Sequence, residues 1–302
     1  EHFISALLRQ SFSKNKSNFQ SSFGENVAAE GLYYVASFNT NESAYGDFGD
    51  YKELGYLALA NYSYKDKYVL DLSFRNDGSS RFASGYRFGN FYSVGAAWNI
   101  SNENFLADSD IVSDLKLRAS FGQTGNNGIG NNQYQSLFGY GGAYDNNGAV
   151  APSTFGNLII SWETAELLDV GVDFSLFDGR LSGGVTYYEK TTEDLLQSVP
   201  LSTTTGHSSQ TMNIGSILNK GVEIEIDAQV LRTKDFSFEV YGNFSENRDE
   251  VLKLAQDAAG NDINLDSFYY TTRVGLPQSQ WYIRSWGGVD PADGRPYYLV
   301  GG

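Results

Sequence analysis

The chain contains no cysteine and only two histidines among its 302 residues. Without cysteine it has neither a disulfide framework nor a thiolate zinc site. Only His2 and His207 could supply an imidazole ligand or a general base. Metal-dependent catalysis is therefore disfavoured, and we expect no cofactor.

The chain is also poor in positive charge. Its 21 Lys and Arg residues face 36 Asp and Glu residues, which gives a net charge of -15. Nucleic-acid binding requires clustered Lys and Arg to neutralise phosphates. This balance argues against a nucleic-acid partner and is otherwise typical of a well-solvated surface.

The chain also lacks long apolar runs. A transmembrane helix needs about 18 or more consecutive apolar residues, and no such run exists. A strand of a membrane barrel needs only about 9 to 11 residues of alternating pattern. The sequence therefore excludes spanning helices and leaves a membrane β-barrel open.

Aromatic residues and glycine are abundant. Phe, Trp and Tyr make up 15% of the chain and there are 33 glycines, a composition typical of strands and tight turns. The clearest pattern runs from Val222 to Phe244, where apolar and polar residues alternate on both sides of a turn at 232–235. One face is apolar and the other carries Glu223, Glu225 and Asp227. Such a hairpin suits a half-exposed soluble sheet or a barrel wall between lipid and a wet lumen.

Similar alternation predicts eight antiparallel strands within residues 52–245. They cover 54–64, 68–75, 92–100, 115–121, 168–176, 181–187, 222–230 and 236–244. We expect residues 1–51 to be a loop region with a short helix over 3–11. Residues 246–302 are expected to form a second loop region, with the chain ending before a barrel would close.

The connections between these strands fall into two alternating length classes. The short ones are 65–67, 101–113, 178–180 and 231–235, and the long ones are 76–90, 123–160, 191–218 and 246 onward. In an antiparallel meander this alternation places every short turn at one end, as in outer-membrane barrels with short periplasmic turns and long extracellular loops. Aromatic residues such as Tyr64, Tyr68 and Trp98 lie near the short-turn end, where a lipid-interface girdle is expected. The pattern favours a membrane barrel over a soluble β-domain.

Three motifs invite chemical interpretations, and each has a simpler one. The glycines of residues 124–130 are one residue short of a dinucleotide-binding turn and lack a βαβ unit, which indicates a loop. His207 lies among Ser and Thr residues, which raises an outer-membrane hydrolase as an alternative, but we favour a surface loop, because adjacent loop residues rarely place a base to serve their own neighbour. The turn from Asp290 to Gly294 is a candidate for Ca²⁺, although its spacing departs from a Ca²⁺ loop.

Aromatic residues in the long loops are candidates for ligand contact, because their rings stack on sugars or peptide side chains. The alternative is that they pack the loops together. We select four residues as substrate contacts: Tyr134, Tyr140, Trp281 and Tyr282.

Several motifs of the chain resemble one family, the SusC/RagA-type TonB-dependent transporters of the Bacteroidetes outer membrane. They are Arg75-Asn76-Asp77-Gly78-Ser79-Ser80-Arg81-Phe82, Leu115 to Asn126, Trp162-Glu163-Thr164 with the ordered matches up to Leu196, Asn219-Lys220-Gly221-Val222-Glu223, and Gly288 to Pro296. Tyr92 and Asp169 depart from the family pattern, which usually has Pro and often Asn there. The resemblance covers about 240 residues, in the same order, and includes the glycine motif of 124–130.

The resemblance implies an all-β fold: a membrane-spanning antiparallel segment of about eight strands from a 22-stranded barrel, without the plug or the TonB-binding segment. It implies localisation in the bacterial outer membrane and active import of an oligosaccharide or peptide, powered through TonB. The implied partners are a SusD-like surface lipoprotein that acts as a lid, the TonB complex, the ligand and lipid.

On this interpretation one set of charged side chains faces the lumen and contacts water or a plug. The set comprises Asp71, Arg75, Asp173, Glu223, Glu225 and Asp227. They are not expected to act as acid or base catalysts. An outer-membrane barrel hydrolase and a soluble β-rich adhesin or binding module remain the competing classes.

Overall fold

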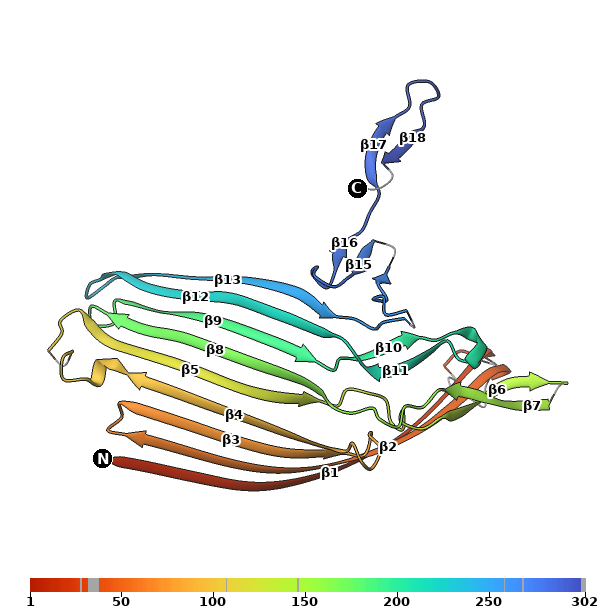
Figure 1. Ribbon diagram of the computed structural model, residues 1–302, viewed down its shortest axis with the longest axis horizontal. Coiled ribbons are helices and arrows are strands. Elements are labelled where there is room, and N and C mark those ends of the chain that lie inside the picture. Colours follow the sequence, from red (N-terminus) through yellow and green to blue (C-terminus); the bar gives the residue numbers. More distant parts are fainter. Residues whose placement is uncertain are drawn as a thin grey trace.

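The computed structural model describes residues 1–27, 29–31, 38–106, 108–145, 147–257, 259–267 and 269–299. Nine long strands form one antiparallel sheet, in the order β1-β2-β3-β4-β5-β8-β9-β12-β13 (Figure 1). Their bounds are β1 His2–Val27, β2 Phe38–Tyr64, β3 Tyr68–Ser79, β4 Phe88–Asn99, β5 Val112–Asn126, β8 Glu163–Leu176, β9 Leu181–Glu193, β12 Ser216–Arg232 and β13 Ser237–Lys253. The sheet does not close on itself, and β1 and β13 are its edges.

Smaller elements lie in the connections. Four small sheets contain β6 Leu137–Tyr144 with β7 Asn147–Thr154, β10 Leu196–Pro200 with β11 Ser209–Asn213, β14 Leu265–Asp266 with β15 Tyr270–Thr272 and β16 Gln280–Trp281, and β17 Ser285–Val289 with β18 Pro296–Leu299. Two short 3₁₀ turns, η2 Ile100–Asn102 and η3 Thr203–Thr205, complete the described elements. Within the described residues, no helix is long and apolar enough to span a bilayer.

The connections sort by length as the sequence predicts, with one exception: residues 80–87 at the long-loop end are fewer than residues 100–111 at the other end. Residues 65–67, 100–111, 177–180 and 233–236 join strands at one end of the sheet, at the left of Figure 1. The two long connections 127–162 and 194–215 lie at the opposite end. The turn at 177–180 is tight because Phe177, Asp178 and Gly179 all have positive φ. Of these three residues, only Gly179 adopts a positive φ without strain. The meander therefore has a short-turn end and a long-loop end.

Strand pairing places apolar residues on one face across the whole sheet. Tyr68 pairs with Trp98, Trp98 with Leu117, and Leu117 with Val172. The row continues through Val185, Ile224 and Phe244. Large side chains on this face remain exposed, such as Phe74 at 49% and Phe244 at 56%. A continuous, exposed apolar face of this size requires lipid or another apolar partner.

The predicted eight strands are all present, and the expectations for the chain ends are wrong in part. Residues 3–11 form no helix, and residues 1–51 are not mainly a loop, because β1 and the first half of β2 pair there from His2 to Val27. The ninth strand of the main sheet is thus β1. At the other end, β13 continues eight residues beyond Ser245 to Lys253, followed by small hairpins.

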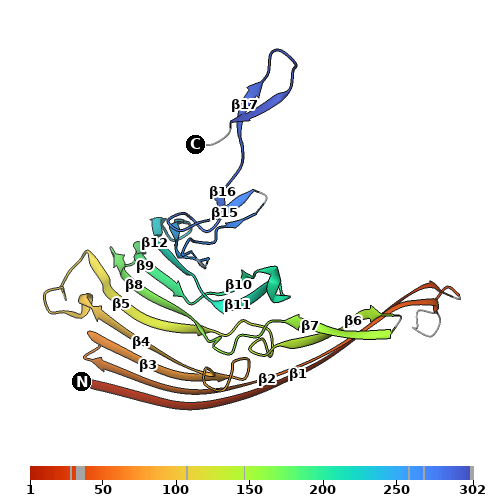
Figure 2. The same ribbon diagram turned by 45° about the vertical axis from the view of Figure 1, so that its right-hand side comes forward.

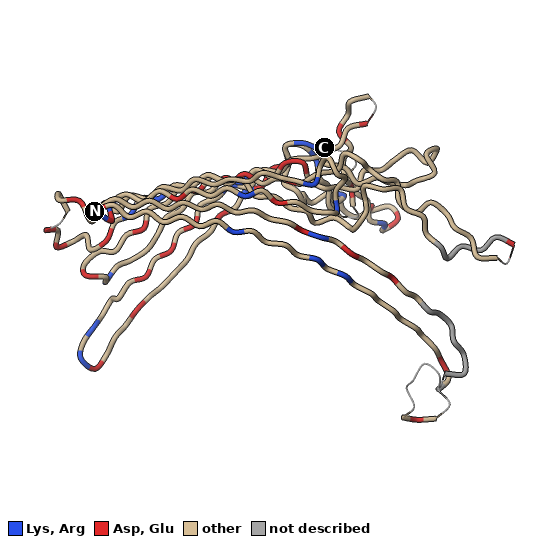
Figure 3. Tube along the Cα trace, turned by 90° about the horizontal axis from the view of Figure 1, so that it is seen from below, with Lys and Arg blue, Asp and Glu red and all other residues tan. Residues whose placement is uncertain are grey.

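The sheet is curved, and the long-loop part of β1 and β2 bends away from the other strands (Figures 2 and 3). Charged residues are distributed along the strands rather than gathered at one end (Figure 3). This distribution follows from the alternation, because every second residue of each strand lies on the polar face.

Candidate functional site: the polar face and the long-loop end

The six charged residues predicted to face the lumen all lie on the face opposite the apolar rows. Asp71 pairs with Asn61 and Gly95, which alternate with the apolar row residues. Asp173 pairs with Gly184, which pairs with Glu225. The remaining members, Arg75, Glu223 and Asp227, occupy the same face by the two-residue period of their strands. The structure therefore groups the predicted residues on one polar face.

Arg118 lies at the centre of this face and binds three side chains there. It is not among the six charged residues predicted to face the lumen. Its guanidinium forms ion pairs with Asp169 at 2.7 Å and with Asp173 at 3.3 Å, and it donates to Thr186 Oγ1 at 2.5 Å. The three partners lie on β8 and β9, the two strands that follow β5 in the sheet. Because Arg118 is one cation between two carboxylates, the cluster keeps a net negative charge and is polar enough to face water.

The long connections pack onto this face at the long-loop end. Phe82 and Ile160 are fully buried and form a small core with Ile129. Trp162 lies between Phe82 and Phe91, with ring centroids 5.5 and 5.4 Å away, and its Nε1 donates to Arg87 O at 2.9 Å. These residues come from β4 and from two connections, 80–87 and 127–162, that meet at the right of Figure 1. The loops are therefore folded against the sheet.

Arg81 fixes the same connections to β2. Its guanidinium lies 4.1 Å from the Tyr51 ring centroid. It also donates to Asn127 O at 3.1 Å and to Asn131 Oδ1 at 3.2 Å. The backbone of Ser80 donates to Lys52 O at 2.9 Å, which adds a second link between this connection and β2. The Arg81 guanidinium thus links the connections 80–87 and 127–162 to β2.

The four predicted ligand contacts are not brought together. Tyr134 packs against the core of Phe82, Ile129 and Ile160. Trp281 and Tyr282 are 62% and 52% exposed, and lie against Tyr270 and Arg273 respectively. Tyr140 belongs to β6, but its side chain lies outside the described residues. Ligand contact by these four residues stays a prediction.

The motifs with chemical interpretations are engaged locally. His207 stacks at a tilt on Phe155, with centroids 5.0 Å apart. Asp290 Oδ1 accepts the backbone N–H of Ala292 at 2.8 Å, and Asp293 pairs with Arg295 at 3.6 Å, so this segment is a hydrogen-bonded turn. Among the described residues, no three His, Cys, Asp or Glu side chains are grouped as metal ligands.

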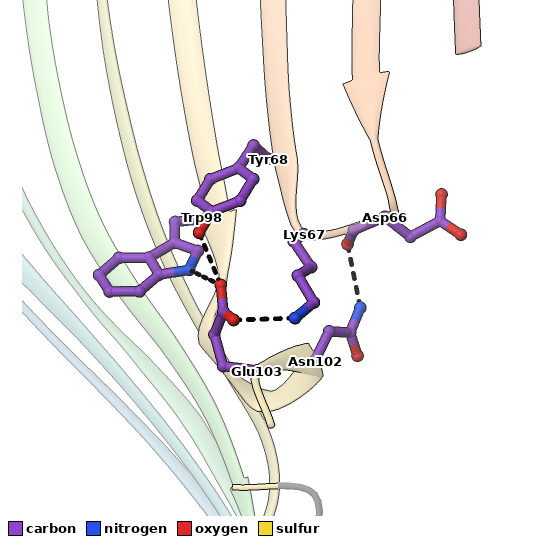
Figure 4. Close-up of polar contacts among 6 residues, drawn as sticks. All are labelled: Asp66, Lys67, Tyr68, Trp98, Asn102 and Glu103. Atoms are coloured by element: carbon purple, nitrogen blue, oxygen red, sulfur yellow. Dashed lines mark hydrogen bonds and ion pairs between the residues drawn. The ribbon is translucent and has the colours of Figure 1, made fainter. Parts of the chain in front are cut away.

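A cluster of hydrogen-bonded polar side chains joins two neighbouring connections at the short-turn end (Figure 4). The Glu103 carboxylate accepts hydrogen bonds from Tyr68 Oη at 2.7 Å, Lys67 Nζ at 2.8 Å and Trp98 Nε1 at 3.2 Å. The hydrogen bonds from Lys67 and Tyr68 are the main reason that the pKa of Glu103 falls to about 2. Asp66 O accepts from Asn102 at 2.9 Å, which ties the next connection to the same turn. The charged groups thus lie directly beside the stacked rings of Tyr64, Tyr68 and Trp98.

Comparison with known proteins identifies the architecture. Residues 6–302 match the family model for the TonB dependent receptor-like β-barrel. The chain belongs to this TonB-dependent receptor family. Among curated members, it is 37% identical over 229 residues to the TonB-dependent receptor SusC of Bacteroides thetaiotaomicron, which covers 72% of this chain and 22% of SusC. It is 42% identical over 200 residues to the TonB-dependent receptor P39 of Formosa agariphila, which covers 66% of this chain and 19% of P39.

Solved structures of the TonB-dependent receptor family give the same result. The chain superimposes on the RagAB peptide transporter with a TM-score of 0.89 and 30% identity, covering 100% of this chain and 33% of that one. This receptor chain therefore spans about a fifth of its curated relatives and a third of the solved structure. The family and these relatives confirm a SusC/RagA-type segment of outer-membrane barrel wall, with short periplasmic turns and long extracellular loops. The family match over residues 6–302 favours this assignment over the hydrolase and soluble-adhesin alternatives.

Proposed function

We propose that the outer-membrane protein containing this chain actively imports a bulky nutrient, an oligosaccharide or a peptide, with energy supplied through TonB. One observation carries the proposal: the sheet has a continuous apolar face and, opposite it, a charged face with loops packed at its extracellular end. Such a wall separates lipid from a water-filled path. The resemblance to a peptide transporter over the whole chain supports an import function.

A SusD-like surface lipoprotein is the proposed lid over the long-loop end. The β6–β7 hairpin and the residues after it present large apolar side chains there, including Phe138 at 64% and Leu158 at 68% exposure. Exposed apolar side chains at an extracellular end suit contact with a protein partner. The hairpin ends, Leu137 and Thr154, pair with one another, so residues 138–153 can be removed without separating the flanking chain.

Uptake by cells that carry the full-length protein tests the import proposal. We expect accumulation of labelled oligosaccharide or peptide that stops when TonB is deleted or the proton gradient is collapsed. Removal of residues 138–153 should reduce both uptake and co-purification of the lipoprotein, whereas shortening the periplasmic turn at 233–236 should leave both unchanged. TonB-independent accumulation, or no accumulation of either ligand class, would contradict the proposed function.

A further inference from the structure

A cavity of about 250 Å³ lies on the polar face between β1, β2 and β3, toward the long-loop end. Its floor is Gly55 on the middle strand. A Cβ at this position would lie 2.6 Å from Asp77 Oδ1 and 2.8 Å from Ser11 Oγ, so any side chain here would enter the space between the neighbouring strands. The glycine therefore keeps the cavity open.

The charges that line the cavity do not balance. Arg75 and Asp77 neutralise one another, with Arg75 Nη2 at 3.1 and 3.0 Å from the two carboxylate oxygens. Glu53 Oε1 accepts a hydrogen bond from Asn127 Nδ2 at 2.9 Å. Glu53 takes part in none of the ion pairs formed by the described residues. The cavity therefore presents one half-buried carboxylate that has an amide donor but forms no ion pair within the described part of the chain.

The opposite wall is held in place by the loops. Asn127 is fixed through its carbonyl by Arg81, which in turn lies over Tyr51. Trp162 also lines the cavity, and its ring is held by Phe82 and Phe91. The cavity thus combines a preorganised apolar wall with a carboxylate. A long side chain with an apolar stem and a charged tip buries its stem and keeps its charge paired in such a place.

The backbone of the surrounding sheet is already occupied. β2 pairs along this stretch with β1 on one side and β3 on the other, so its N–H and C=O groups are used in ladders. A ligand cannot add here as an extra strand and must be recognised through side chains. A neutral sugar ring would leave the charge of Glu53 uncompensated, whereas an ammonium or guanidinium group would pair with it.

We propose that this cavity is a subsite for a cationic side chain of a peptide ligand, with Glu53 as the residue that selects the charge. The proposal rests on the import function above and specifies the ligand class. The stem of a ligand Lys or Arg would lie along Trp162, and its cationic group would meet Glu53 near the extracellular entrance. The hydroxyls of Ser11 and Ser13, which also line the cavity, would accept its remaining donors.

Binding to the purified full-length protein tests the subsite. The probe is a pair of oligopeptides that are identical except that one carries arginine and the other citrulline, which has nearly the same shape without the charge. Calorimetry should show about 5- to 20-fold tighter binding of the arginine peptide, an effect between those of a neutral and a charged hydrogen bond, because the site is partly solvated. The preference should weaken with added salt. Glu53→Gln should abolish it, and Glu225→Gln, an acid on the same face outside the cavity, should preserve it.

Gly55→Ala serves as a second variant, because its added Cβ enters the cavity floor. It should weaken binding of both peptides, and heat-modifiable gel mobility should show that each variant folds. Equal affinity for the two peptides, a preference that survives Glu53→Gln, or binding of neutral oligosaccharides alone would overturn the subsite. If TonB-dependent uptake continues in that case, the subsite is wrong and the import function stands.

Discussion

Arginine substitutions on the apolar face provide the most direct test of which face meets lipid. A strand rises about 3.4 Å per residue, and a tilt of about 40° leaves about 2.6 Å per residue along the barrel axis. Val172 lies four residues before the end of β8 at Leu176, which places it about 10 Å inside the periplasmic boundary. The apolar band of such barrels is about 25 Å tall, so Val172 lies near its middle.

The depth of the substituted residue in the bilayer determines how far an arginine destabilises the folded barrel. Val172→Arg should destabilise the folded barrel by about 2–4 kcal/mol, because its charge would lie near the bilayer midplane. Ile224 lies eight residues before the end of β12 at Arg232, about 21 Å inside the boundary and near the far edge of the band, so Ile224→Arg should cost only about 1–2 kcal/mol. Leu70 lies only two residues from the start of β3 at Tyr68, about 5 Å inside the boundary, and Leu70→Arg should cost about 1–2 kcal/mol.

The measurement is equilibrium folding of the full-length protein into lipid vesicles, followed by tryptophan fluorescence across a urea titration. Ser73→Arg is the matched control, because Ser73 lies on the polar face of the same strand as Leu70 and pairs with Ser93. It should change stability by less than about 0.5 kcal/mol. If Val172→Arg cost no more than Ser73→Arg, or Leu70→Arg cost the most, the assignment of faces and depths would be refuted.

Two further predictions concern the ends of the sheet. Because the pKa of folded Glu103 is about 2 and an unfolded carboxyl titrates near about 4.3, its stabilisation is present above the unfolded value and is lost as pH falls toward 2. Urea midpoints in micelles should therefore fall more steeply between pH 5 and pH 2 for the wild type than for Glu103→Gln, and parallel curves would contradict this. Trp162→Ala removes the ring between Phe82 and Phe91, which should cost about 2–3 kcal/mol locally and raise amide exchange in residues 80–87 and 127–162 without unfolding the barrel. Unchanged exchange would show that Trp162 does not hold these loops.

The eight predicted strands share one physical property, which is that their two faces meet different solvents. Lipid on one side and water on the other impose a two-residue period, and that period is visible in a single sequence. β1 departs from it, because Phe3 and Ile4, and then Leu7 and Leu8, place apolar residues on both faces. Adjacent apolar pairs at this spacing imitate a helical stripe. The ladder with β2, continuous from His2 to Val27 apart from one irregularity after Phe23, overrides that local signal.

The long-loop end follows a different rule, because water surrounds it on all sides and no period is imposed. Its structure depends on a few specific contacts, namely the Arg81 bridge and the Trp162 packing. Neither could be inferred from composition, and the packing of Tyr134 against the loop core could not be inferred from it either. The charged cavity beneath these loops depends on a glycine floor and on the Glu53 carboxylate, which only strand register brings together. Specificity in this protein should therefore be sought where loop and strand meet, and Glu53 is the residue whose substitution would reveal it.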